Sequence, residues 1–96
     1  MLATGCSTHK FVASKYPNGK PEVVLYLKGE GEEAVKVMEK VFYPNGQLEY
    51  VGHFENGVEN GEWEYFYESG TRKYLETWLA GVEHGSHYDY SPDGQV

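Results

Sequence analysis

Residues 83–89 are the segment of this 96-residue sequence with the most potential metal ligands, because two histidines and two acidic residues lie close together along the chain. Imidazole nitrogens and carboxylate oxygens are ligands for divalent metals such as zinc. On an extended strand, however, side chains three positions apart project to opposite faces. His84 and His87 would converge only if a turn at Gly85 folded one of them back, so we expect no metal site.

The reactive side chains do not predict a catalytic centre. Nucleophilic catalysis needs Ser, Thr or Cys beside a His and an orienting acid, and the single cysteine, Cys6, lies near the start of the chain. General acid–base catalysis needs carboxyls whose pKa is shifted in a sheltered pocket. Glu62 and Glu64 instead alternate as expected of a solvated strand face. We therefore expect a non-enzymatic protein with no catalytic residue and no cofactor.

The aromatic side chains offer a different chemistry, the recognition of another protein. The chain has 9 Tyr, 4 Phe and 2 Trp, and such side chains dominate protein contact surfaces. The candidate binding-face residues are Tyr50, Phe54, Trp63, Tyr65, Tyr74, Trp78 and Tyr88. The alternative is that the repeated aromatics form a core between neighbouring units. Under the first interpretation the partner is a protein.

Alternating side chains predict the strands that position these rings. Between residues 48 and 55, Leu, Tyr, Gly and Phe occupy every second position, and Glu, Val, His and Glu lie between them. Residues 62–67 alternate in the same way, with Trp63, Tyr65 and Tyr67 on one side. Period-two alternation is typical of a half-buried β-strand. We therefore expect one aromatic face and one largely charged face, with Val51 as the exception.

A 24-residue spacing organises the chain. The turns YPNG at 43–46, YESG at 67–70 and SPDG at 91–94 share it, and an earlier YPNG at 16–19 is displaced by three further residues. All four asparagines precede glycine, a pair that favours tight hairpin turns. The predicted turn glycines are Gly19, Gly46, Gly57, Gly61, Gly70, Gly81, Gly85 and Gly94. Because a lone hairpin is marginal in water, we expect an all-β fold in which stacked hairpins form one open antiparallel meander.

The first unit departs from this pattern through a longer polar middle around residues 28–33. Its strands are predicted at residues 22–28 and 34–43. A helix over residues 32–40 is the alternative, since Glu and Lys are good helix formers. The alternation of Val35, Val37 and Val41 favours a strand.

The segment GEWEYFY at residues 61–67, following a Tyr-x-x-Gly turn, resembles a MORN-type repeat of the bacterial MORN-variant class. The resemblance covers about residues 16–94 and rests on the 24-residue register. It implies a β-meander repeat protein, and many bacterial members are described as antitoxins or as lipid-anchored envelope proteins. The third unit departs from the pattern, with His87 where the preceding unit has Trp63.

The net charge of −7 is unevenly distributed. Residues 1–42 carry six Lys and five Glu, whereas residues 43–96 carry two basic and ten acidic side chains. Nucleic acids and anionic lipids require clustered Lys and Arg, so we expect neither as a partner. The acidic side chains either cover solvated strand faces or, between Glu55 and Asp93, attract a basic protein.

The first residues predict a tether. Residues 1–7, MLATGCS, resemble the cleavage end of a bacterial lipoprotein signal in which Cys6 is lipidated, although Ala3 stands where a bulky aliphatic is usual. The longest wholly apolar run, residues 23–27, is too short to span a membrane. We therefore expect membrane contact only through a lipid on Cys6.

Together these observations divide the chain into a flexible N-terminal tether, residues 1–15, and a β-hairpin repeat domain, residues 16–96. The units lie near 16–42, 43–66 and 67–90, with a partial unit at 91–96. The expected function is a protein-interaction module of a bacterial envelope lipoprotein, located at the envelope or its periplasmic face, or in the cytoplasm without the lipid. The alternative is an antitoxin or immunity protein whose acidic surface neutralises a basic toxin.

Overall fold

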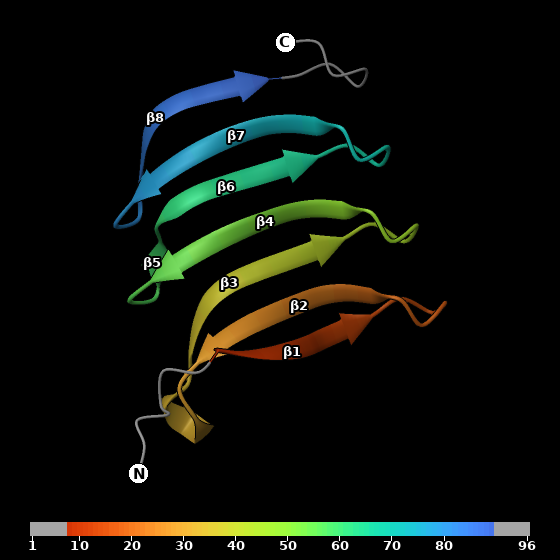
Figure 1. The fold of residues 1–96 in the computed structure, drawn as a ribbon, viewed down its shortest axis with the longest axis horizontal. Coiled ribbons are helices and arrows are strands. Elements are labelled where there is room, and N and C mark those ends of the chain that lie inside the picture. Colours follow the sequence, from red (N-terminus) through yellow and green to blue (C-terminus); the bar gives the residue numbers. More distant parts are fainter. Residues whose placement is uncertain (1–7, 90–96) are drawn as a thin grey trace.

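The computed structural model describes the backbone of residues 8–89 and the side chains of residues 8–84. This part of the chain forms one eight-stranded antiparallel sheet in meander order, which confirms the predicted fold (Figure 1). The strands are β1 (Thr8–Lys15), β2 (Pro21–Lys28), β3 (Val35–Phe42), β4 (Leu48–Glu55), β5 (Val58–Glu59), β6 (Gly61–Phe66), β7 (Arg72–Leu79) and β8 (Val82–Asp89), with one 3-10 turn, η2 (Gly31–Glu33). Neighbours follow the order β1-β2-β3-β4-β6-β7-β8, and the short β5 pairs with the end of β4.

The sheet is a single layer with two faces. The molecule measures 50 × 37 × 18 Å, and the strands lie side by side as one twisted, curved ribbon (Figure 1). The buried hydrophobic residues among those described are Val24, 2% exposed, and Trp63, 8% exposed. They lie on opposite faces of the sheet. Val24 pairs with Lys40, which pairs with Val51, so these three side chains share one face. Tyr50 is next to Val51 in β4 and therefore lies on the other face, together with Trp63. Each face therefore has its own small apolar centre.

At one end of the sheet, the first two Tyr-x-x-Gly turns each bond to the end of the strand that leads into the next turn. The hydroxyl of Tyr16 donates to the carbonyl of Phe42 at 2.6 Å, and that of Tyr43 donates to the carbonyl of Phe66 at 2.7 Å. Because each bond spans one unit, the turns stabilise the stacking of whole hairpins.

The asparagines of these turns add a second bond between units. The side-chain amides of Asn18 and Asn45 donate to the carbonyls of Pro44 and Glu68, both at 3.1 Å. The third turn has Ser69 at this position, and its hydroxyl accepts from the backbone N–H of Thr71 at 3.4 Å. The glycine that closes each turn takes the left-handed conformation, with φ of 88° at Gly19 in the first of them.

At the opposite end, two tight turns connect β4 to β5 and β7 to β8. Asn56 and Gly57 have φ of 54° and 85°, and Ala80 and Gly81 have φ of 52° and 86°. Two positive φ values in succession define the hairpin turn that Asn-Gly favours. Alanine in this conformation is strained, because its Cβ approaches the backbone.

The first unit has the strands that the alternation predicted. Residues 22–28 and 34–43 were expected, and β2 and β3 occupy Pro21–Lys28 and Val35–Phe42. The helix considered for residues 32–40 is wrong, since only the single turn Gly31–Glu33 is helical.

Two other expectations were wrong. Residues 8–15 form β1 rather than part of a flexible tether, because the turn at 16–19 needs a strand on each side. The exposed lysines of this edge strand made the segment resemble a polar linker in the sequence. Charges of this kind protect sheet edges from pairing with other chains. Gly85 lies inside β8 rather than at a turn, and Gly94 lies outside the described residues.

The face opposite the rings is less charged than expected. Its central row aligns Val12, Val24, Lys40, Val51, Glu64 and Leu75 across the strands. Four of these six residues are apolar, so Val51 belongs to a mostly apolar stripe rather than being an exception. Alternation within one strand could not reveal this stripe, since its members come from six strands.

Candidate functional site

Strand register brings three tyrosines into one row. Tyr50 on β4 pairs with Tyr65 on β6, which pairs with Tyr74 on β7. The ring centroids of Tyr50 and Tyr65 are 5.5 Å apart, and Tyr65 and Tyr74 stack at 4.4 Å. Cross-strand aromatic pairs of this kind stabilise a sheet.

Trp63 lies at the centre of the aromatic face, which we define as Tyr50, Phe54, Trp63, Tyr65, Tyr74 and Trp78. Its ring centroid lies 6.0 Å from Tyr50, 5.2 Å from Phe54 and 6.5 Å from Trp78. The indole covers Gly52 so closely that an added Cβ would meet ring atoms at 2.4–2.5 Å. Its Nε1 donates to the carbonyl of His53 at 3.0 Å. Glycine on β4 is thus what allows the indole to lie flat against the sheet.

Two carboxylates lie among these rings. Glu39 accepts hydrogen bonds from the Tyr50 hydroxyl and, at 3.1 Å, from the Lys36 ammonium. Glu76, the strand partner of Trp63, accepts at 3.2 Å from both the Tyr65 hydroxyl and the Trp78 indole. The aromatic face is therefore apolar in area but carries negative charge at two points.

Burial raises the pKa of the Tyr50 phenol above its ordinary value of 10.0, and the neighbouring Glu39 carboxylate adds to the effect. The pKa of Tyr65 is raised in the same direction by burial and then by Glu76. Both phenols therefore act as neutral hydrogen-bond donors at physiological pH.

The six sequence-predicted rings with described side chains do share one face, and each contacts at least one of the others. Apart from Trp63 they are half-buried, so they pack together and also meet solvent. The side chain of Tyr88 lies outside the described part of the chain, as does Cys6. The two interpretations of the rings, core and contact surface, are thus compatible.

Sequence reasoning missed Glu39 and Glu76 as part of this face. A signal for them exists in the 24-residue register, where Glu39 precedes Trp63 by 24 and Glu76 follows Gly52 by 24. In the first unit Glu39 lies beside its strand partner Leu25. In the next unit the position equivalent to Glu39 is Trp63, which covers Gly52. The same structural position therefore holds a ring in one unit and a carboxylate in another.

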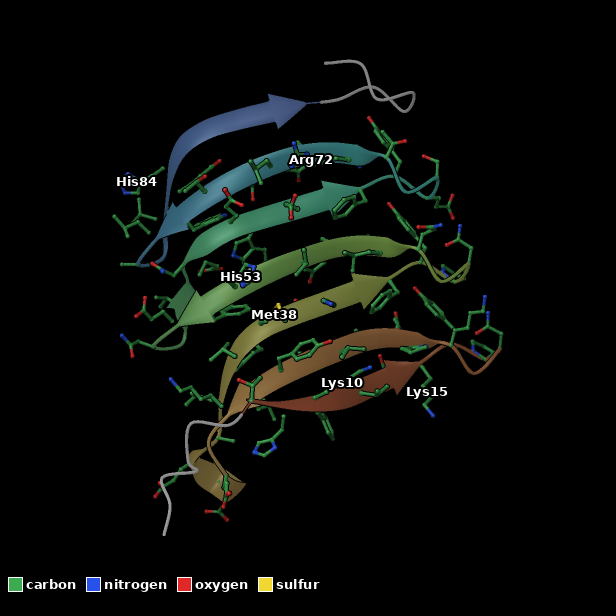
Figure 2. All side chains as sticks on the ribbon, viewed as in Figure 1. Lys10, Lys15, Met38, His53, Arg72 and His84 are labelled. Carbon is green, nitrogen blue, oxygen red and sulfur yellow. The ribbon has the colours of Figure 1, made fainter. Side chains whose placement is uncertain are left out.

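The opposite face carries its own charged contacts. The Lys40 ammonium lies 5.3 Å from the centroid of the Tyr26 ring. Arg72 donates to Glu64 at 2.9 Å, and both side chains are more than 30% exposed. Figure 2 shows Arg72 on β7 and, on the adjacent strands β3 and β4, Met38 and His53, which are register partners. An ion pair as exposed as Arg72–Glu64 contributes little to stability.

Within residues 8–84, no three His, Cys, Asp or Glu side chains are grouped as a metal site would require. The same part of the chain encloses no pocket. No helix in the described structure is long and apolar enough to cross a membrane.

Comparison with known proteins supports the repeat. Residues 38–56 and 59–79 match the family described as MORN repeat variant, which supports a MORN-repeat family. All six residues of the aromatic face, and both carboxylates, lie within these two segments. The chain is also similar to a sulfate adenylyltransferase of the yeast Debaryomyces hansenii, at 30% identity over 80 residues. That similarity covers 83% of this chain but spans only 15% of the yeast protein. No solved structure matches.

Proposed function

We propose that this chain is a non-enzymatic repeat module that binds another protein through its aromatic face. The observation that carries the proposal is the group of six contacting rings on one side of a single-layer sheet, five of them half-buried. Half-buried Tyr and Trp side chains present large, rigid contact area at a low entropic cost. Their packing against one another preorganises the surface before a partner arrives.

The coincidence between the family match and the rings adds support. The two MORN-variant segments carry the whole aromatic face. We propose no adenylyl transfer, because the similarity to the sulfate adenylyltransferase spans only 15% of that protein.

The test compares two tyrosines on opposite faces. Tyr74→Ser removes a ring from the aromatic face, and Tyr26→Ser removes a half-buried ring from the other face. Each variant serves as bait for proteins of the native host, with retained proteins quantified by mass spectrometry. We expect a stoichiometric partner that Tyr26→Ser retains and Tyr74→Ser loses at least tenfold. Equal retention by both variants would reject the aromatic face as the contact surface.

We further propose that the module belongs to a bacterial envelope lipoprotein tethered through Cys6. The lipobox-like residues around Cys6 support this placement. The test is metabolic labelling of the full-length gene product with a radioactive fatty acid, with Cys6→Ser as the control. Label that is absent, or that persists in Cys6→Ser, would reject the tether.

The alternative proposal is an antitoxin that neutralises a basic toxin. The excess of ten acidic over two basic side chains in residues 43–96 supports it. Long-range attraction between exposed charges is screened by salt, so such a partner should elute between about 0.1 and 0.5 M salt. A partner that resists salt would favour the envelope module instead.

A further inference from the structure

One carboxylate on the aromatic face already holds a cation. The Lys36 ammonium lies 3.1 Å from Glu39 Oε1 and 4.3 Å from the centroid of the Phe54 ring. The protein itself therefore places a lysine between a carboxylate and a ring on this surface. Both contacts are favourable, one as an ion pair and the other as a cation–π interaction.

The next unit also brings a ring and a carboxylate together, although its carboxylate stands at the repeat position of Gly52 rather than that of Glu39. Trp78 follows Phe54 by 24 residues, and Glu76 is two positions from Trp78 on the same face of β7. Glu76 accepts hydrogen bonds from Tyr65 and Trp78, which are both uncharged. Among the described side chains the ion pairs are Lys36–Glu39 and Arg72–Glu64, so Glu76 has no cation there.

We propose that Glu76, framed by Trp63, Tyr65 and Trp78, binds a lysine side chain of the partner protein. The inference rests on the proposed protein-binding function and names the group that the aromatic face recognises. The partner's ammonium would meet the Glu76 carboxylate and the face of the Trp78 ring, as Lys36 meets Glu39 and Phe54.

Physical complementarity favours a lysine over a neutral group. Half-burial of Glu76 between rings weakens solvent screening of its charge, so an incoming cation is attracted more strongly than at an open surface. Aromatic ring faces attract cations, and indole does so best. The four-carbon stem of lysine can lie along the exposed edges of the rings while its ammonium reaches the carboxylate. The net charge of −7 also draws basic segments toward the sheet.

The probe is the peptide Gly-Ser-Lys-Gly-Ser-Lys-Gly, titrated into the full 96-residue chain. The reporter is the Trp78 indole N–H in a nitrogen–proton NMR spectrum, because this group bonds to Glu76 itself. We expect saturable shifts of this signal. Glu76→Gln should weaken binding by about tenfold, since it removes the charge but keeps an oxygen that accepts from Tyr65 and Trp78.

The matched control is Glu39→Gln, which removes one negative charge from the same face, as Glu76→Gln does. It should change affinity less than about twofold, because Lys36 already occupies that carboxylate. Equal weakening by the two substitutions would overturn the proposal, since it would indicate general charge attraction rather than a site.

A second comparison leaves the protein unchanged. The same peptide with acetylated lysines keeps the length of the side chain but lacks the charge. It should bind at least tenfold more weakly. Equal binding of the acetylated peptide, or no shift of the Trp78 signal with millimolar lysine peptide, would overturn the lysine site.

The result can be separated from that of the proposed function. A host protein retained by both wild type and Glu76→Gln but lost by Tyr74→Ser would reject the lysine site and keep the aromatic face as the contact surface. Loss of the host protein with Glu76→Gln, together with retention by Glu39→Gln, would support both proposals.

Discussion

Replacing Gly52 by Ala should destabilise the sheet, although the backbone there can accommodate alanine. Gly52 is not among the glycines with positive φ, so no backbone strain is expected. A Cβ at this position would lie 2.4–2.5 Å from three atoms of the Trp63 indole. These atoms belong to the rigid ring system, so the whole indole must move away from β4.

The magnitude follows from the area that the moved ring exposes. A buried aromatic side chain covers about 150–250 Å², and Trp63 is 8% exposed. If about half of that area meets water again, the loss is about 2.5 kcal/mol at 25 cal/mol per Å². Alanine in place of glycine in a strand recovers about 0.5–1 kcal/mol. The net destabilisation is therefore about 1.5–2 kcal/mol, or a fall in Tm of about 10 °C.

Urea unfolding followed by circular dichroism measures this change. The decisive comparison places Gly52→Ala in a Trp63→Leu background, where the smaller side chain leaves room for the added methyl group. There the substitution should be neutral or stabilising by about 0.5–1 kcal/mol.

Equal destabilisation in both backgrounds would refute the steric argument. A Gly52→Ala variant that is more stable than the wild type would also refute it, because only the gain in strand propensity would then remain. Either result would mean that Trp63 does not rest on Gly52.

Three further predictions concern the turns and the phenols. Ala80→Asn should raise the urea midpoint by the equivalent of about 0.5–1 kcal/mol, because Ala80 has a φ of 52° that asparagine tolerates better; a lower midpoint would contradict this. Tyr43→Phe should cost about 0.5–1.5 kcal/mol in the same assay by removing the bond to the Phe66 carbonyl, and an unchanged midpoint would show that this bond does not stabilise the stacking. Raised pKa values at Tyr50 and Tyr65 favour the neutral phenols in the folded state, so their contribution to stability is complete below pH 10 and is lost as the pH rises above it. Unfolding free energies measured from pH 8 to 11.5 should fall above pH 10, and less steeply in Tyr65→Phe; an equal slope in both proteins would contradict the assignment.

Local signals in the sequence were sufficient to predict the architecture of the sheet. Asn-Gly and Tyr-x-x-Gly turns, recurring every 24 residues, predicted stacked hairpins, and six of the predicted turn glycines do have positive φ. Alternation placed Tyr50 and Phe54 on one face and Trp63 and Tyr65 on one face of the next strand. These signals succeed because turn conformation and strand alternation depend on neighbours along the chain.

The boundary of the domain could not be predicted in the same way. The polar composition of residues 8–15 suggested a tether, yet their pairing with β2 makes them a strand. A sheet edge tolerates lysines on its open side, so composition alone does not separate an edge strand from a solvated linker.

The sequence by itself determined the repeat, the hairpin turns and the all-β meander, since each arises from short-range chemistry that recurs at a regular interval. Only the tertiary structure decided which residues meet across strands. It set Trp63 on Gly52, aligned Tyr50 with Tyr65 and Tyr74, and surrounded Glu76 with rings. The physical reason is that cross-strand contacts depend on register. Register is set jointly by the turns and by the packing on both faces, which no single strand encodes.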